Sequence, residues 1–324
     1  MESKHQSPKA PVIAIVVPCY NEVEALPISA PVLLGILDRM AATDLASPES
    51  YILCVDDGSR DGTWDLIGRL HASDRRLRGI TLTHNRGHQY ALLAGLTTVM
   101  NRCDAAISID ADLQDDPACI LEMVSQFRAG KEIVYGVRAS RASDTAFKRG
   151  TAHAFYSFQK TMGLETVYDH ADYRLMSNRA LQLLAEYGER NIFLRGIVPQ
   201  IGLDTAIVKY DRNPRCAGES KYPLSKMLAL SVDGITSFSA RPMRWIFFTG
   251  LVIFILTLLV SLYVLVSYFI GGHTSPGWTS IMLSVWFLGS VIIMAVGIVG
   301  EYVGKIFVEV KHRPRFAVKS EIWD

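Results

Sequence analysis

A long stretch without charged residues limits what this chain can fold into. No Asp, Glu, Lys or Arg occurs from position 245 to position 300. Within it, residues 246–270 and 278–300 are apolar segments of 25 and 23 residues. As helices rising about 1.5 Å per residue, both exceed the hydrocarbon thickness of a bilayer, about 30 Å. A buried core hairpin is the alternative, but the charge-free length argues against it. We therefore predict a soluble N-terminal domain followed by two transmembrane helices.

The charges around the apolar segments predict how they cross the membrane. The short turn at 271–277 has no Lys or Arg. Basic residues flank both outer ends: Arg241, Arg244, Lys305, Lys311, Arg313 and Arg315. Because cytoplasmic loops are enriched in basic residues, both outer ends are predicted to be cytoplasmic. The prediction is a multi-pass protein of the plasma membrane with its soluble domain in the cytoplasm.

The remaining segments complete the predicted domain organisation. Residues 1–11 are polar and lack an apolar core, so they are predicted to be a disordered tail and not a signal peptide. Residues 222–240 alternate apolar and small polar residues at helical spacing, which predicts an amphipathic helix on the membrane surface. Residues 241–304 hold the transmembrane hairpin, and residues 305–324 form a basic cytoplasmic tail. The soluble domain then covers residues 12–221.

Composition excludes some classes of function and location. The net charge of +1 argues against a general nucleic-acid binder, so no nucleic-acid partner is predicted. Five cysteines include no Cys-x-x-Cys pair, which is typical of reduced thiols in a cytosolic domain. They are Cys19, Cys54, Cys103, Cys119 and Cys216.

Strands and helices alternate along the soluble domain. Apolar runs at 12–17, 51–55, 79–82, 105–109 and 133–137 are predicted strands, and helical patterns lie between them. This alternation predicts an α/β domain with a mostly parallel sheet and helices on both faces. Ligands of such sheets bind beyond the carboxyl ends of the strands, where the polar loops of this chain begin.

Two aspartates follow the fourth predicted strand. Asp110 and Asp112, separated by Ala111, form a hard-oxygen site of the kind that holds Mg²⁺ or Mn²⁺, which uses one or two protein carboxylates and completes its shell with phosphate and water. Gln114 is a candidate second contact to the metal, the sugar or a phosphate. The alternative is a solvated acidic turn between a strand and a helix.

Three motifs in order resemble family 2 glycosyltransferases of the GT-A fold. They are Val-Pro-Cys-Tyr-Asn-Glu at 17–22, Val-Asp-Asp-Gly-Ser-Arg-Asp-Gly-Thr at 55–63 and Asp-Ala-Asp-Leu-Gln at 110–114. The resemblance spans residues 12–138 and implies that Pro18, Tyr20 and Glu22 line the base and ribose of a nucleotide sugar. It implies that Asp57 contacts the base or ribose edge, although an ordinary Asp-Gly turn is the alternative there.

Further segments resemble the polyprenyl-phosphate branch of that family, which includes bactoprenol glucosyltransferases and dolichol-phosphate mannose synthase. They lie at 85–89, 136–138, 172–176, 191–196 and 210–222. In the last segment, Arg212, Arg215, Ser220 and Lys221 are predicted to bind phosphate, because guanidinium groups pair with phosphate oxygens. Attraction to anionic lipid is the alternative. By resemblance, Arg138 and Arg149 hold the lipid phosphate.

Two aspartates are candidates for a catalytic base or for a residue that orients the acceptor. Asp169 and Asp172 stand where the family often has Asp-Thr-Gly-Asp, but His170 and Ala171 replace Thr-Gly here and change the expected loop. A phosphate monoester has its second pKa near 6, so the lipid phosphate is already largely the nucleophilic dianion at neutral pH. Positioning and charge neutralisation are therefore predicted to matter more than base catalysis.

The predicted function is an inverting, metal-dependent transfer of a sugar from a nucleotide donor to undecaprenyl or a related polyprenyl phosphate. UDP-glucose is the first choice of donor; a UDP-amino sugar, a 4-amino-arabinose derivative and GDP-mannose stay open. A processive synthase is disfavoured because Arg241 stands where its Gln-x-x-Arg-Trp motif needs Gln. A non-catalytic membrane anchor or lipid-flipping partner is the alternative of another class. The resemblance also implies a homo-oligomer, with a tetramer as one form.

Overall fold

The computed structural model describes residues 10–138, 170–190, 192–211 and 277–323, with scattered positions from 246 to 266. These residues belong to two compact units. The first holds the sheet and its helices, including the C-terminal residues from Arg313 onward. The second holds the apolar segments up to His312. The predicted tail at 1–9 and the predicted amphipathic helix at 222–240 lie outside the described residues.

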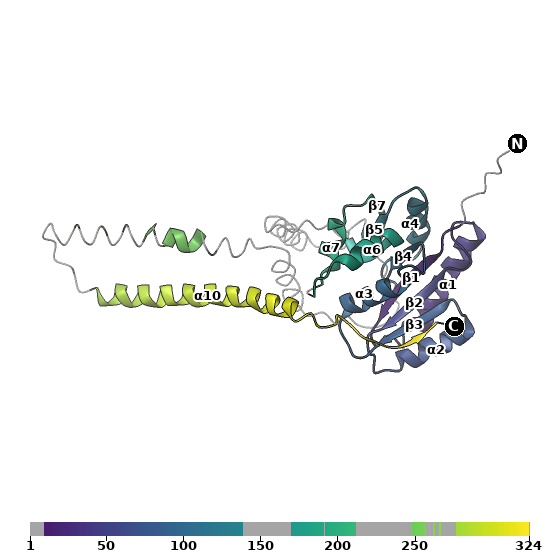
Figure 1. The fold of residues 1–324 in the computed structure, drawn as a ribbon, viewed down its shortest axis with the longest axis horizontal. Coiled ribbons are helices and arrows are strands. Elements are labelled where there is room, and N and C mark those ends of the chain that lie inside the picture. Colours follow the sequence, from purple (N-terminus) through teal and green to yellow (C-terminus); the bar gives the residue numbers. More distant parts are fainter. Residues whose placement is uncertain are drawn as a thin grey trace. The chain divides into compact units, whose positions relative to one another are not determined.

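The first unit is built on one mixed sheet of eight strands in the order β7-β5-β6-β4-β1-β2-β3-β8 (Figure 1). Its strands are β1 Ile13–Cys19, β2 Tyr51–Asp56, β3 Leu77–Leu82, β4 Ala105–Ser108, β5 Ile133–Arg138, β6 His170–Ser177, β7 Thr205–Tyr210 and β8 Val318–Ile322. Parallel pairs join β3, β2, β1 and β4, and also β5 and β7. Strand β6 runs antiparallel between β4 and β5, and β8 runs antiparallel beside β3. The predicted α/β domain with a mostly parallel sheet is thus confirmed, and the sheet is mixed.

Helices cover both faces of the sheet because side chains alternate along each strand. The helices of this unit are α1 Leu26–Ala42, α2 Thr63–Ser73, α3 His88–Val99, α4 Cys119–Arg128, α6 Asn178–Glu186 and α7 Leu194–Gln200. On β1, Ile15 and Val17 belong to a buried cluster that includes residues of α1 and α4. Val16 points the other way, toward α3.

Helix α3 lies unusually close to the sheet, and this positions its first turn. A Cβ atom at Gly95 would lie 2.4 Å from Val16 Cγ1 and 2.7 Å from Val55 Cγ2, so only glycine fits there. The helix starts after Gly87, whose φ of +91° a side chain rarely adopts. The start of α3 therefore projects from the carboxyl ends of the central strands, where ligands bind in sheets of this kind.

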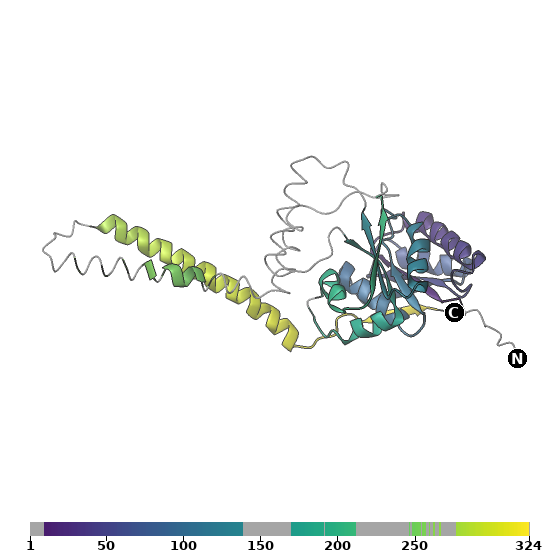
Figure 2. The same ribbon diagram turned by 90° about the horizontal axis from the view of Figure 1, so that it is seen from above.

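The second unit contains one long helix, α10 Trp278–Val310, continuous in both views (Figure 1, Figure 2). Its segment Phe287–Val310 has a mean hydropathy of 2.0 and no buried part, so its length and composition allow it to cross a membrane. Among the described residues, α10 is the one helix that could cross a membrane. The sequence analysis predicted two such helices. The helix also continues past position 300, the predicted end of the second span. Most of the predicted first span, 246–270, lies outside the described residues.

The C-terminal segment returns to the sheet, which the sequence analysis did not predict. Strand β8 lies within the segment 305–324, for which we expected a basic tail, and it pairs with β3 at the edge of the sheet (Figure 1). Its residues are mostly exposed, so backbone hydrogen bonds attach most of the strand, and Ile322 at its end packs against the core. Trp323 then packs edge-on against Tyr51, with ring centroids 5.6 Å apart. Arg78 lies over both rings, and Arg102 lies over Trp323.

This attachment predicts a measurable role for Trp323. Replacing Trp323 with Ala removes an aromatic pair and two cation–π contacts, so we expect a loss of about 1–3 kcal/mol in stability. Hydrogen exchange should show faster exchange at the β3 amides that face β8. The exposed neighbour Lys319 provides the matched control, Lys319→Ala. Equal exchange in both variants would contradict the account.

Candidate functional site

The first two strand ends are joined by hydrogen bonds between their loops. In the loop after β1, the Asn21 N–H donates to Ser59 Oγ at 2.9 Å, and Asn21 Oδ1 accepts from the Arg60 N–H at 2.9 Å. The Glu22 N–H donates to Thr63 Oγ1 at 3.0 Å. These bonds fix the loop after β1 against the loop after β2, so that both form one wall at the carboxyl edge of the sheet.

The predicted nucleoside contacts differ in how much surface they offer. Tyr20 is 42% exposed and offers its ring to a ligand. Glu22 is half-buried in the same loop, whereas Pro18 is buried within β1 and shapes the end of the strand. The structure therefore brings Tyr20 and Glu22 to the loop surface and leaves Pro18 beneath it.

The neighbouring pair Asp56 and Asp57 is buried and holds loops together. Asp56 accepts from the Ser59 N–H at 3.1 Å and from Thr81 Oγ1 at 2.6 Å. Asp57 is 2% exposed, and its two oxygens accept from the backbone N–H groups of Arg86 and Gly87 at 2.7 and 2.8 Å. Burial raises the pKa of Asp57, an effect that those two N–H groups oppose. Asp57 thus fixes the turn that starts α3; its contact with a base or ribose stays a prediction.

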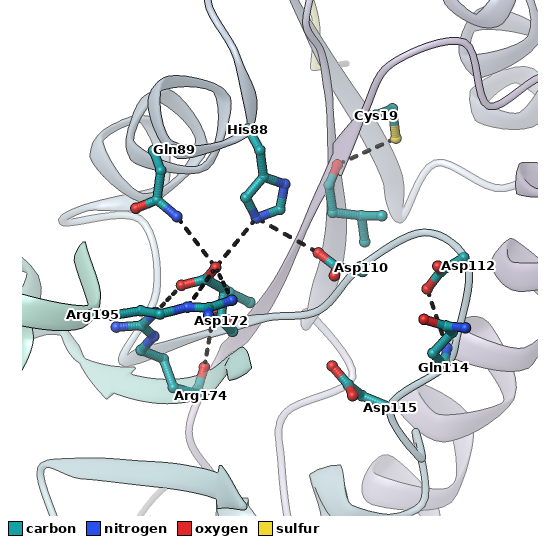
Figure 3. Close-up of polar contacts among 12 residues, drawn as sticks. Cys19, His88, Gln89, Asp110, Asp112, Gln114, Asp115, Asp172, Arg174 and Arg195 are labelled. Carbon is teal, nitrogen blue, oxygen red and sulfur yellow. Dashed lines mark hydrogen bonds and ion pairs between the residues drawn. The ribbon is translucent and has the colours of Figure 1, made fainter. Parts of the chain in front are cut away.

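The two candidate metal ligands lie beyond β4, as predicted. In Figure 3 the carboxylate of Asp110 faces His88, whereas that of Asp112 faces Gln114, whose N–H donates to it at 3.2 Å. Burial raises the pKa of Asp110, the positive charge of His88 lowers it, and Asp172, Asp115 and Asp112 raise it further. Such crowding of carboxylates is what a divalent cation relieves.

The carboxylates of Asp110 and Asp112 fit a hard cation that takes its other ligands from a substrate and from water. Among the described residues no group of three or more His, Cys, Asp or Glu side chains is arranged around a metal position. Two carboxylates are enough for Mg²⁺ or Mn²⁺ when phosphate oxygens and water supply the rest. Asp110 and Asp112 are the residues that would hold it.

Hydrogen bonds around the buried Asp115 support the loop that carries these aspartates. Asp115 accepts from Tyr210 Oη at 2.6 Å and from Arg138 Nη2 at 3.2 Å. The hydroxyl of Tyr173 donates to the Asp116 carbonyl at 2.9 Å. Arg138, predicted to hold a lipid phosphate, therefore already has a carboxylate partner and connects β5 to the loop after β4.

Asp172 lies at the centre of a cluster of polar and charged side chains (Figure 3). Its side chain is 6% exposed, and Oδ1 forms an ion pair with Arg174, which is 1% exposed. Oδ2 accepts from Arg195 Nε and Nη2 at 3.3 and 3.0 Å, and from Gln89 Nε2 at 3.2 Å. His88 Nε2 lies 3.6 Å from the same oxygen and 3.7 Å from Asp110 Oδ1.

The register of the sheet explains why this cluster meets the metal candidates. Ser108 of β4 lies opposite Arg174 of β6 in an antiparallel pair. Continuing that register by two residues brings Asp172 opposite Asp110. Residues two apart lie on the same face of a strand, so Arg174 and Asp172 share a face. His88, at the start of α3, then bridges the two aspartates.

The charges in the cluster shift each pKa in a definite direction. Burial alone would raise the pKa of Asp172, but Arg195, His88 and Arg174 outweigh it and hold that pKa well below its usual range. Burial alone would lower the pKa of His88, but Asp172 and Asp110 outweigh it and leave that pKa raised. Asp172 is therefore a stable carboxylate, which suits a positioning role better than that of a base.

The sequence analysis gave no role to His88, Gln89, Arg174 or Arg195. All four occur in segments noted for resemblance, at 85–89, 172–176 and 191–196. A signal existed for His88 and Gln89, since polar residues at the start of a helix after a strand end belong to the ligand-binding edge. The other predicted site residues lie outside the described part of the chain: Asp169, Arg149, Arg212, Arg215, Ser220 and Lys221.

Comparison with known proteins shows the family of this chain. The family model for glycosyl transferase family 2 matches residues 14–193, which is more than half of the chain. The chain belongs to glycosyl transferase family 2. It is 47% identical to the uncharacterized glycosyltransferase YkoT of Bacillus subtilis (strain 168), covering 97% of this chain and 93% of that protein. It is 35% identical to the bactoprenol glucosyl transferase of Shigella phage SfX, covering 95% of this chain and 99% of that protein.

Solved structures are more distant from this glycosyltransferase. A mannosyltransferase from Pyrobaculum calidifontis, in complex with GDP-Man and Mn²⁺, is 14% identical over 92% of this chain and 85% of that chain, with a TM-score of 0.40. That score is too low to assign a fold or a ligand from this likeness.

The bonds of Asp57 give this glycosyltransferase a direct test of its loop geometry. In Asp57→Asn the amide nitrogen cannot accept, so one of the N–H groups of Arg86 and Gly87 loses its partner. A buried unpaired donor costs about 1–3 kcal/mol, and we expect that loss of stability with faster exchange at these two amides. The control is Glu24→Gln, the same acid-to-amide change at an exposed position. It should alter neither the stability nor the exchange of the Arg86 and Gly87 amides. Unchanged amide exchange in Asp57→Asn would contradict the role given to Asp57.

Proposed function

We propose that this glycosyltransferase transfers a sugar from a nucleotide donor to a polyprenyl phosphate, with inversion, at the cytoplasmic face of a membrane. The likeness to the bactoprenol glucosyl transferase of phage SfX carries the proposal, because it covers 95% of this chain, apolar segments included. A glycosyltransferase with a soluble acceptor does not need those segments. UDP-glucose is the donor we propose; the other nucleotide sugars named above are the alternatives.

The donor would bind along the carboxyl edge of the sheet. Tyr20 has the exposed ring needed to cover a base, and Glu22 has oxygens for a ribose hydroxyl. Asp110 and Asp112 would hold Mg²⁺ or Mn²⁺ near the diphosphate. A bound divalent cation neutralises charge on the leaving diphosphate and orients it. Gln114 stays a candidate contact to the metal, the sugar or a phosphate.

The acceptor needs positioning more than it needs a base. A phosphate monoester is largely dianionic at neutral pH, and the lowered pKa of Asp172 makes that carboxylate a weak proton acceptor. Arg138, Arg149, Arg212, Arg215, Ser220 and Lys221 are proposed to bring the lipid phosphate to the sugar, as the resemblance implies. Asp169 keeps its proposed role in orienting the acceptor, and a homo-oligomer stays a prediction.

The path of the chain supports an even number of membrane crossings. Strand β7 precedes the apolar segments and β8 follows them, yet both belong to the same sheet. A chain that leaves and re-enters one domain must return to the same side of the membrane. If α10 crosses once, a second crossing falls between β7 and α10, where the charge-free residues 246–270 are long enough.

A reconstituted assay tests the reaction. With radiolabelled UDP-glucose and undecaprenyl phosphate, we expect labelled lipid that disappears with EDTA. Asp110→Asn should lower turnover by at least about 100-fold, because losing even an outer partner of a metal ligand costs about 10- to 100-fold. Asp44→Asn, at an exposed position far from the site with φ of +53°, is the control. Unlabelled lipid with every donor tested would favour the non-catalytic alternative.

Cysteine labelling from each side of sealed vesicles tests the crossings. Arg179 is exposed and marks the sheet domain, so Arg179→Cys and Lys319→Cys should react with an impermeant maleimide from the same side. Ser275→Cys should react only from the opposite side. The background carries Ser at Cys119 and Cys216, since the described Cys19, Cys54 and Cys103 are buried. Labelling of all three sites from one side would refute the hairpin.

A further inference from the structure

We propose that Arg195 binds a phosphate group of one of the two substrates, and that Asp172 holds it in the binding position. The inference rests on the proposed function and adds to it a binding residue and a role for a buried carboxylate.

Two hydrogen bonds fix the backbone of Leu194, the residue immediately before Arg195. The N–H of Leu194, the first residue of α7, donates to Gln89 Oε1 at 3.0 Å. The carbonyl of Leu194 accepts from Arg174 Nη1 at 3.3 Å. Helix α3 and strand β6 therefore set the point from which the Arg195 side chain leaves α7.

The side chain of Arg195 is also fixed, although 40% of it is exposed. Its Nε and Nη2 both donate to Asp172 Oδ2, which orients the plane of the guanidinium group. Nη1 donates to no group in the described part of the chain. The guanidinium thus has an oriented N–H group left for a ligand. In Figure 3 the side chains of Arg195, Gln89 and His88 converge on the carboxylate of Asp172.

The need to neutralise the charge of Asp172 does not by itself explain why a second arginine, Arg195, pairs with it. Arg174 already forms an ion pair with Asp172 and is almost completely buried. A second arginine leaves these three groups with a net charge of +1, and a further carboxylate whose charge acts on Arg195, that of Asp110, is the candidate metal ligand. Arg195 is the more exposed of the two arginines that pair with Asp172, and fixing a long side chain costs rotamer freedom. Binding of an anionic ligand would explain both the positive charge of Arg195 and the fixed orientation of its guanidinium group.

The position of the cluster indicates which anion fits. His88 lies 3.6 Å from Asp172 and 3.7 Å from Asp110, so only one side chain separates the carboxylate that holds Arg195 from the candidate metal ligand. A group bound by both a cation at Asp110 and a guanidinium at Arg195 must be rich in anionic oxygens. Phosphate is that group, since guanidinium donors match its oxygens. The donor diphosphate and the lipid phosphate share this chemistry.

Equilibrium binding separates these two sources. The full-length protein in detergent is titrated with UDP plus Mn²⁺, and separately with a short-chain polyprenyl phosphate. Arg195→Gln should weaken one ligand by roughly 10- to 100-fold, as expected for a lost charge-assisted hydrogen bond. Weaker UDP binding assigns Arg195 to the donor diphosphate, and weaker polyprenyl phosphate binding assigns it to the acceptor. Arg195→Lys, which keeps the charge but not the fork, should lose less.

Controls distinguish binding from a structural role. Arg179→Gln breaks an exposed ion pair with Glu132 and should leave both affinities unchanged. Thermal unfolding of every variant reports any loss of folding, and Arg195→Lys provides the comparison if Arg195→Gln is unstable. If the variants fold and bind both ligands within twofold of wild type, this inference is overturned and the proposed function is not affected. Wild-type protein that binds neither ligand would overturn the proposed function and this inference with it.

Discussion

The buried carboxylate of Asp172 joins three elements that are distant in sequence. It lies on β6, accepts from Gln89 of α3 and Arg195 of α7, and pairs with Arg174 on its own strand. Removing a charge from water is costly unless partners surround it, and a buried charge that loses its partner destabilises the fold strongly. The elements must therefore meet at this point for the fold to be stable. As a result, His88 and Arg195 are held beside Asp110.

Much of the fold was predictable from the sequence because buried parallel strands leave a clear pattern. Strands β1 to β5 appear as apolar runs, and the loops after them carry the motifs. Strand β8 was missed because its residues are mostly exposed and its pairing uses the backbone. The partners of Asp172 were missed for another reason. They depend on the antiparallel register of β6 against β4 and on the position of α7, which spacing along the chain does not reveal.

The structure gives a positioning role to two residues that the sequence analysis singled out. Asp172 was a candidate base, yet its arginine partners hold its pKa well below the usual range. Asp57 was a candidate nucleoside contact, yet both its oxygens accept from the turn before α3. Both carboxylates position other groups in this structure. Under the proposed function, this edge of the sheet is where the nucleotide donor meets an acceptor in the membrane.

The central claim is that Asp110 and Asp112 hold a cation whose bound diphosphate lies within reach of the cluster around Asp172. A structure of the protein with UDP and Mn²⁺, with the ion located by its anomalous scattering, tests this most directly. The account predicts the ion at about 2.0–2.3 Å from carboxylate oxygens of Asp110 or Asp112, the usual range for such small hard cations. An ion or a diphosphate bound elsewhere in the protein would contradict it.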